Sequence, residues 1–400
     1  MARRIALWPV ALLLFFPLGC ADETTVPDAQ TEVTVESLPG FLFSPPVLDD
    51  DGTTRILLLH DMEGLAGQDD WRTTMAWHPE QYEKGREYLT ADVNAVISGL
   101  FDGGADEVVV MDGHGSGNPE PDILLDRMDA RAEFIDWTTM PSGPLWEHIA
   151  IDAIAAVGMH SRTGGGGFMA HTNQLGMDYI VNGRHMNETE QMMYRWGEAG
   201  IPIVFVSGDD KLREQLLPYP WIEYVITKFA TSASTAELRP VEEVHEEMRA
   251  AAARAVETIP AAKAVVPKTP ITAGLRASPP ADLSILEGVP GIASYQDQTV
   301  TFEAESLLEA RRGMSALMRV ARGGYRDVTL QTFARLDPAR LDPACEIELS
   351  AGNSVGLEVS RPSCSKRSWV PEPTDIPFLL WLDYESGRWA PPDEWVPPKR

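Results

Sequence analysis

The stretch Ile56-Leu57-Leu58-Leu59-His60-Asp61-Met62-Glu63-Gly64 joins an apolar run directly to two carboxylates. Side chains alternate between the two faces of a strand, so Asp61 and Glu63 are expected to point the same way. Two carboxylates on one face repel each other unless a cation or a proton lies between them. The stretch therefore predicts a buried strand that ends at a cation-binding position.

Two other apolar runs also end in residues of the metal-ligand type. Residues 107–111 lead into Asp112-Gly113-His114, and residues 154–157 lead into Gly158-Met159-His160. In open α/β sheets, ligands bind beyond the carboxyl ends of the strands. Three strand ends that carry Asp, Glu and two His therefore predict one metal site.

Outward from these strands, the chain alternates between helical and strand patterns. Apolar residues recur at helical spacing over residues 80–100, and Gly103-Gly104 end that pattern. Further helices are predicted over residues 145–152, 188–197, 241–259 and 306–322, and further strands over residues 178–181, 201–206, 283–286 and 299–302. We expect an α/β fold with an open, mainly parallel sheet flanked by helices, a smaller α+β portion and a C-terminal extension that contains a disulfide.

The N-terminal residues 1–20 have the pattern of a secretory signal. Two arginines precede the apolar stretch 5–18, which is short for a membrane span, and a glycine precedes Cys20. This arrangement resembles a bacterial lipoprotein signal with a lipid anchor at Cys20, and plain secretion with cleavage nearby is the alternative. We expect an exported protein of the bacterial cell envelope, anchored to the membrane in the periplasm or on the surface.

The remaining chain divides into three parts by composition. Residues 21–52 are rich in Asp, Thr, Pro and Glu and are expected to form a flexible tether. Residues 53–333 carry the α/β pattern of a catalytic domain, and residues 334–400 form a C-terminal extension. In an oxidising compartment, Cys345 and Cys364 of this extension are expected to form a disulfide.

The formal net charge of −27 at pH 7 excludes one class of partner. A protein that binds nucleic acid needs a basic surface to pair with phosphates. We therefore expect no nucleic-acid partner.

Five of the six candidate site residues also have an ordinary structural interpretation. Asp61 and Glu63 could cap a helix or face solvent, and His114 could be a surface histidine in a glycine-rich loop. His171 could be a ligand, a general base or a packed histidine. Glu188 lies in the first turn of a predicted helix, where the helix dipole favours a carboxylate in any case. These patterns, taken singly, leave the alternatives open.

Two further features are assigned no chemical role. The glycines at positions 164–167 lack the Lys-Ser/Thr ending of a phosphate-binding loop, so we expect a mobile flap that shapes a pocket. The other five histidines are expected to be structural or exposed: His60, His78, His148, His185 and His245.

Six short segments between about residues 55 and 322 carry a family resemblance in combination. They are Asp61-Met62-Glu63-Gly64, Asp112-Gly113-His114, Gly158-Met159-His160-Ser161-Arg162, Met169-Ala170-His171, Asn187-Glu188 and Val206-Ser207-Gly208-Asp209-Asp210. Together they resemble the zinc-dependent D-aminopeptidases of the DppA type, peptidase family M55. Leu59 departs from the small or polar residue that the family usually has two places before the aspartate.

The resemblance implies a site with two zinc ions per chain. Asp61 would bridge the ions, Glu63 and Glu188 would complete one site, and two histidines would complete the other. The implied metal ligands are Asp61, Glu63, His114, His160 and Glu188, and the implied catalytic residue is His171.

The resemblance also implies an activity and an assembly. The activity is release of N-terminal D-amino acids, such as D-Ala, from short peptides by a metallo-aminopeptidase. The alternatives are a binuclear metal amidase or esterase with another substrate, and a non-catalytic surface binding protein on the same fold. The implied assembly is a ring-like homo-oligomer, which the C-terminal extension could block or alter.

Overall fold

The computed structural model describes residues 38–48, 51–76, 78–136, 139, 145–279, 281–290, 292, 294–323, 349–350 and 358–359. The expected signal segment with Cys20, most of the tether and nearly all of the C-terminal extension lie outside these residues. The expected disulfide between Cys345 and Cys364 lies outside them as well. Within the described ranges, no helix combines the length and the apolar character that a bilayer span requires.

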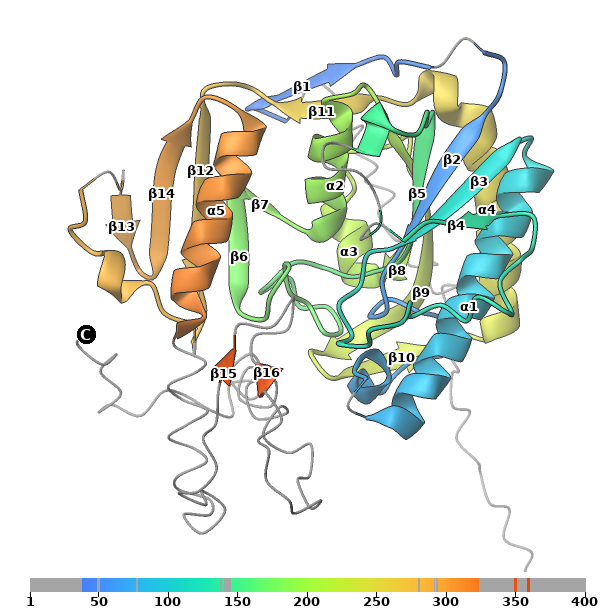
Figure 1. The fold of residues 1–400 in the computed structure, drawn as a ribbon, viewed down its shortest axis with the longest axis horizontal. Coiled ribbons are helices and arrows are strands. Elements are labelled where there is room, and N and C mark those ends of the chain that lie inside the picture. The colour runs from blue at the N-terminus through green and yellow to red at the C-terminus, as the bar shows by residue number, and fades with distance from the viewer. Residues whose placement is uncertain are drawn as a thin grey trace, which may run out of the picture.

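A largely parallel sheet forms the centre of the described part of the molecule (Figure 1). In spatial order, its seven strands are β10 (Thr235–Leu238), β9 (Glu223–Ser232), β8 (Ile203–Asp209), β5 (Ala153–Met159), β2 (Arg55–His60), β3 (Glu107–Asp112) and β4 (Glu133–Phe134). Of these strands, β10 alone runs antiparallel to its neighbour. The chain moves from β2 outward to β4, returns to the other side of β2 at β5, and continues to β9. The order therefore reverses between β2 and β5, the point where open α/β sheets bind ligands.

Two long helices cover one face of this sheet. These are α1 (Pro79–Asp102) and α4 (Val241–Thr258), and α1 begins with a proline, whose missing N–H costs nothing in the first turn. Ile56 and Leu58 of β2 pack in the apolar cluster beneath them, whereas Leu57 and Leu59 pack on the opposite face. A Cβ on Gly99 of α1 would lie 2.2 Å from the carbonyl oxygen of Arg249 in α4, so glycine permits this close helix contact.

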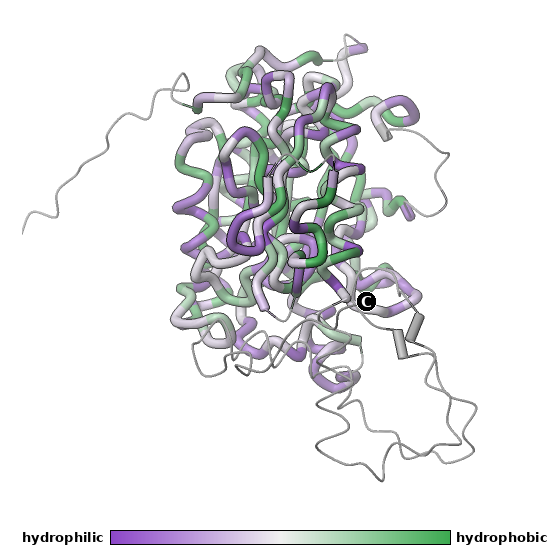
Figure 2. Tube along the Cα trace, turned by 90° about the vertical axis from the view of Figure 1, so that its left-hand side faces the viewer, coloured by the Kyte–Doolittle hydropathy of each residue, from purple (hydrophilic) through white to green (hydrophobic). Residues whose placement is uncertain are grey.

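The apolar cluster on the opposite face of the main sheet includes residues of α2 (Glu188–Gly197), of α3 (Asp210–Gln215) and of a second, antiparallel sheet. Its strands, in spatial order, are β13 (Ser294–Gln296), β14 (Thr299–Ala304), β12 (Ile271–Ala277), β6 (Met177–Val181) and β7 (Arg184–Met186). The helix α5 (Leu307–Ala321) covers β12 and β14. In Figure 2, the apolar green segments run through the interior and polar purple segments border them. The expected α/β class with a smaller α+β portion is confirmed for the described residues.

The folded body begins earlier than the composition suggested. Residues Phe41–Ser44 form β1, which pairs antiparallel with β11 (Ala264–Pro267). Phe41 is buried, and its ring centroid lies 4.9 Å from that of Tyr194 in α2. Part of the range 21–52, where we expected a tether, therefore belongs to the fold.

Two predicted elements have a different form. The expected strand over residues 283–286 is a 3-10 turn, Ser284–Leu286, because the Asp282 carboxylate accepts from the backbone and hydroxyl of Ser284 and starts a turn. The expected helix over residues 145–152 is reduced to the 3-10 turn Leu145–Glu147. The strands β9 to β12 were not predicted. In β9, the polar residues Thr227 and Lys228 occupy buried positions, which hides the strand pattern.

Candidate metal centre

All six predicted site residues gather at the C-terminal edge of the main sheet. Each comes from a segment that the topology brings to the switch point between β2 and β5. Asp61 and Glu63 follow β2, His114 follows β3, and His160 follows β5. His171 lies in the loop between β5 and β6, and Glu188 begins α2.

The ends of β2 and β5 approach so closely that only glycines fit between them. A Cβ on Gly64 would lie 2.0 Å from the carbonyl oxygen of Met159. Gly158 has a φ of +74°, and its Cβ would lie 2.2 Å from the carbonyl oxygen of Asp61. Both contacts are shorter than any real Cβ contact, and the left-handed φ also favours glycine. These two glycines therefore place the Asp61 turn beside His160.

Short distances join carboxylate oxygens to histidine Nε2 atoms across the centre. His114 Nε2 lies 3.3 Å from Glu63 Oε1. His160 Nε2 lies 3.4 Å from Asp61 Oδ2 and 3.6 Å from Glu188 Oε1. Candidate ligand atoms of three overlapping triplets lie within 4.8 Å of one another: Asp61, Glu63 and His114; Asp61, His160 and Glu188; and Glu63, His160 and His171.

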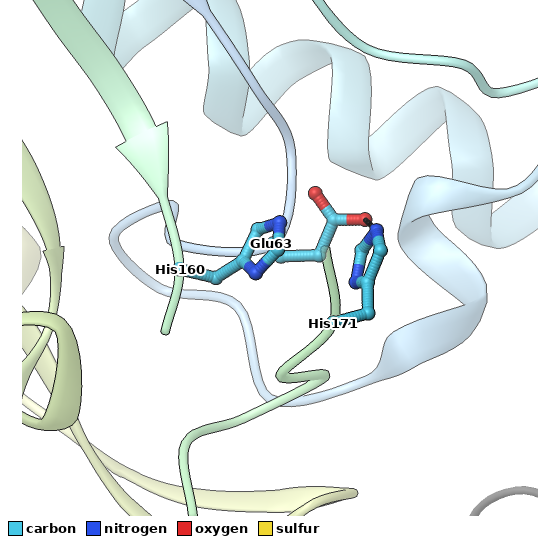
Figure 3. Close-up of side chains that lie close together, drawn as sticks. All are labelled: Glu63, His160 and His171. Atoms are coloured by element: carbon cyan, nitrogen blue, oxygen red, sulfur yellow. Dashed lines mark ion pairs between the residues drawn. The ribbon is translucent and has the colours of Figure 1, made fainter. Parts of the chain in front are cut away.

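His171 approaches the same centre from the other side of the glycine loop. Its Nε2 lies 3.7 Å from Glu188 Oε1 and 4.0 Å from Glu63 Oε1. Its ring stacks on His160, with centroids 4.2 Å apart and planes at 16°. Figure 3 shows Glu63 and the two imidazoles converging from three separate segments of the chain.

Backbone hydrogen bonds fix the orientation of two imidazoles. His160 Nδ1 lies 2.9 Å from the Ser161 carbonyl oxygen, and His171 Nδ1 lies 2.7 Å from the Met169 carbonyl oxygen. A carbonyl oxygen only accepts, so Nδ1 donates and the neutral ring keeps its lone pair at Nε2. His160 Nε2 is buried and has no hydrogen-bond partner among the described residues. Such an atom suits a metal ligand.

The third imidazole is held by a carboxylate that the sequence analysis missed. His114 Nδ1 lies 2.9 Å from Asp122 Oδ2. The other Asp122 oxygen accepts from the Ser116 hydroxyl at 2.5 Å and from the Tyr82 hydroxyl. A carboxylate behind a histidine is a common support for a metal ligand. No spacing rule links a histidine to such a support, so Asp122 gave no signal in the sequence.

Charge pairing has a larger effect than burial on the pKa values of the clustered side chains. Burial by itself lowers the pKa of His160, but Asp61, Glu188 and Glu63 raise it to about 10. Burial by itself raises the pKa of Glu63, but the neighbouring imidazoles, His114 foremost, hold it well below its usual range. In the absence of a cation, protons on the imidazoles thus balance the clustered carboxylates.

The donor set fits zinc. Zinc takes imidazole nitrogens and carboxylate oxygens as ligands, and both kinds are present here. Two observations indicate a place for a cation: His160 Nε2 is buried without a hydrogen-bond partner among the described residues, and three carboxylates, those of Asp61, Glu63 and Glu188, lie close together. The residues present therefore fit a zinc site.

Neighbouring features have structural roles. His60 is buried beside Asp112, with Nδ1 3.7 Å from Oδ1, and His245 Nε2 lies 2.8 Å from Asp92 Oδ1 between α4 and α1. Neither belongs to the ligand triplets. In the glycine loop, a Cβ on Gly167 would lie 2.2 Å from both Ser161 Oγ and Asp209 Oδ2. Close packing thus accounts for the glycine at this position. The mobile flap that we expected over residues 164–167 stays a prediction.

The fold and the centre define a class: an α/β protein that gathers imidazole and carboxylate ligands at the switch point of its sheet. A family model described as D-aminopeptidase, peptidase family M55, matches residues 54–316. The match covers more than half of the chain, and the protein belongs to this family.

Two relatives extend this finding. A D-aminopeptidase of Bacillus subtilis (strain 168) is 29% identical over 164 residues, which span 40% of this chain and 58% of that protein. A solved structure, described as the Zn-dependent D-aminopeptidase DppA from Bacillus subtilis, a self-compartmentalizing protease, aligns with a TM-score of 0.58 at 23% identity. That alignment covers 67% of this chain and 98% of the solved chain, and it supports the fold.

Proposed function

We propose that this protein is a zinc-dependent aminopeptidase that releases N-terminal D-amino acids, such as D-Ala, from short peptides. The observation that carries the proposal is the convergence of five ligand-type side chains and a sixth residue, His171, at the switch point of the sheet. Membership of the D-aminopeptidase family supports the same activity.

We assign two zinc ions to each chain. Asp61 would bridge them, Glu63 and Glu188 would complete one site, and His114 and His160 would complete the other. When bound, the ions supply Lewis acidity toward the scissile carbonyl and lower the pKa of the attacking water. Two of the ligand triplets share Asp61, which supports its bridging role, and the division of the other four ligands rests on the family resemblance.

His171 is assigned the proton transfer. Its side chain is 15% exposed, whereas those of His160 and His114 are 0% and 6% exposed, so His171 is the most accessible of the three to a substrate. Because its Nδ1 donates to a backbone carbonyl, its Nε2 is the atom that takes up and returns a proton. His171 therefore acts as general base and general acid in this proposal.

The free amine of the substrate needs a negative partner. Glu188, with 18% of its side chain exposed, is better placed to hold that ammonium group than Glu63, which is 2% exposed. An anchored amine fixes where each enantiomer places its carbonyl, and misplacement by about 1 Å can cost about 10²-fold in rate. D-selectivity would follow from this anchoring.

We also propose export and assembly. The signal-like residues 1–20 support export to the cell envelope with a lipid anchor at Cys20, followed by a tether, the catalytic domain 53–333 and the extension 334–400. Peptides with D-Ala, such as cell-wall fragments, would be the substrates there. The self-compartmentalizing solved relative supports a homo-oligomer.

A stereochemical assay tests the proposed activity. Zinc-loaded protein, residues 21–400, should cleave D-Ala-Gly about 10²-fold faster than L-Ala-Gly and should act poorly on N-acetylated D-Ala-Gly. Chromatography of the released amino acid measures all three rates. Equal D and L rates would remove the stereochemical part of the proposal, and no cleavage of any substrate would refute the peptidase activity.

A further inference from the structure

Three consecutive backbone carbonyls of the turn 61–64 are each held by a buried side chain. All three donors are polar residues with no exposed surface, and two of them are neighbours on β9, far away in sequence. The hydrogen bonds run from Gln68 Nε2 to Met62 O at 2.6 Å, from Lys228 Nζ to Glu63 O at 2.8 Å, and from Thr227 Oγ1 to Gly64 O at 2.7 Å.

Lys228 is the unusual member of this set. Lysine is almost never fully buried unless it is paired, because desolvation of an ammonium group is costly. Here the hydrogen-bond partners of Nζ are not carboxylates: they are the Glu63 carbonyl and, at 2.7 Å, the side-chain oxygen of Gln68. The Nζ also lies 4.6 Å from the centroid of the Phe168 ring, within cation–π distance.

These contacts connect the two halves of the candidate centre. On one side, Lys228 holds the turn that carries the carboxylates of Asp61 and Glu63. On the other, it faces Phe168, which begins the segment in which the Met169 carbonyl orients the His171 ring. A displacement of either segment would break a contact with Lys228.

We propose that Lys228 is a positioning residue that, with Gln68 and Thr227, holds the turn 61–64 in register with the segment 168–171 and so aligns the metal ligands with His171. The inference rests on the proposed metal-dependent function. The hydrogen bonds do not depend on the charge, because a neutral amine still has two N–H donors for the two oxygen partners.

The test compares Lys228→Met with the wild-type full chain. Methionine has a similar length but no donor, so two buried oxygens lose their partner. In metal-free protein, hydrogen exchange by mass spectrometry should be faster in peptides that cover residues 61–68, where the backbone N–H groups of Asp61 and Gly64 bond to β5. Zinc affinity, measured by chelator competition, should fall by about 10- to 100-fold, as for other residues that support metal ligands. The visible spectrum of the cobalt-substituted protein should shift.

A purely structural lysine would lower stability without these local changes. Leu317→Ala provides the matched control, because it removes buried packing on α5, away from the centre. It should lower the melting temperature and leave exchange over residues 61–68, zinc affinity and the cobalt spectrum unchanged. Thr227→Val should reproduce the Lys228→Met changes in weaker form, because it removes the donor to Gly64.

The outcomes separate the two proposals. Wild-type exchange, affinity and spectrum in folded Lys228→Met protein would overturn the positioning role. If that variant does not fold, wild-type behaviour of Thr227→Val would overturn it. If the wild-type chain itself binds no zinc, the proposed function fails, whereas the exchange comparison in metal-free protein still decides the role of Lys228.

Discussion

At the scale of single residues, the hydrogen bonds of each imidazole decide which of its two nitrogens remains available to bind a ligand. Three histidines use Nδ1 for a carbonyl or carboxylate oxygen, so all three direct Nε2 toward the carboxylate cluster of Asp61, Glu63 and Glu188. The distances alone do not separate a metal ligand from a proton carrier, because His171 lies only slightly farther from Glu188 than His160 does. The greater exposure of His171 is what distinguishes it.

Replacement of His171 by alanine tests this distinction. His171→Ala should retain two zinc ions, measured by elemental analysis, because the other five side chains provide the ligands. Its kcat toward D-Ala-Gly should fall by about 10²-fold or more, as expected for the loss of a general acid–base group. Loss of zinc would make His171 a ligand, and unchanged kcat would leave it only a structural role.

Asp122 makes a second prediction at this scale. Asp122→Asn keeps the size of the side chain but removes its charge and one of its two acceptor oxygens, so the remaining oxygen cannot serve both the His114 ring and the two hydroxyls. We expect zinc affinity to fall by about 10- to 100-fold at the site that uses His114. Chelator competition measures the change, and Asp129→Asn, at a loop carboxylate paired with Arg131 outside the centre, is the control. Equal affinity in both variants would show that Asp122 does not support the site.

At the scale of elements, local signals predicted the strands that carry the ligands. Buried strands such as β2 and β5 are nearly continuous apolar runs, so their ends, and hence Asp61 and His160, stand out in the sequence. β9 was missed because Thr227 and Lys228 are buried polar residues whose partners in the turn 61–64 lie more than 160 residues away. Asp122 and Lys228 were invisible for the same reason: their roles depend on tertiary contacts, not on spacing.

The close contact of β2 and β5 gives a prediction at this scale. Gly158→Ala should reduce both stability and zinc binding, because its Cβ would force the Asp61 carbonyl, 2.2 Å away, to move. Gly183→Ala is the matched control: its φ is +79°, and no atom of the described residues lies within 4 Å of its Cβ, so it carries only the backbone strain of about 1–2 kcal/mol. Thermal melts and zinc titration compare the two variants. Equal loss of stability with unchanged zinc affinity would contradict the proposed role of Gly158.

At the scale of the whole molecule, the centre joins segments from residue 61 to residue 188 and draws support from β9. A ligand that binds the folded chain and not the unfolded one stabilises the entire fold, by about 4 kcal/mol at 1,000 times its Kd. Without a metal, protonation of the imidazoles provides part of this stabilisation. Zinc and protons therefore compete for the same cluster, and the stabilisation by zinc must depend on pH.

The sign of this dependence follows from His160. In the metal-free fold, the pKa of His160 is raised from its ordinary value of 6.5 to about 10, despite burial, by Asp61 and its neighbours. Its protonated form thus stabilises the metal-free fold fully below pH 6.5, and this contribution is lost as the pH rises toward 10. In the zinc-loaded protein the ring is neutral throughout, so no such loss occurs. The difference in Tm between zinc-loaded and metal-free protein should therefore widen from pH 6.5 to 10, as measured by calorimetry. His245, whose pKa is raised mainly by its hydrogen bond to Asp92, is paired in both forms and cancels in the difference. A difference that stays constant or narrows over this range would show that protons on His160 do not compete with zinc.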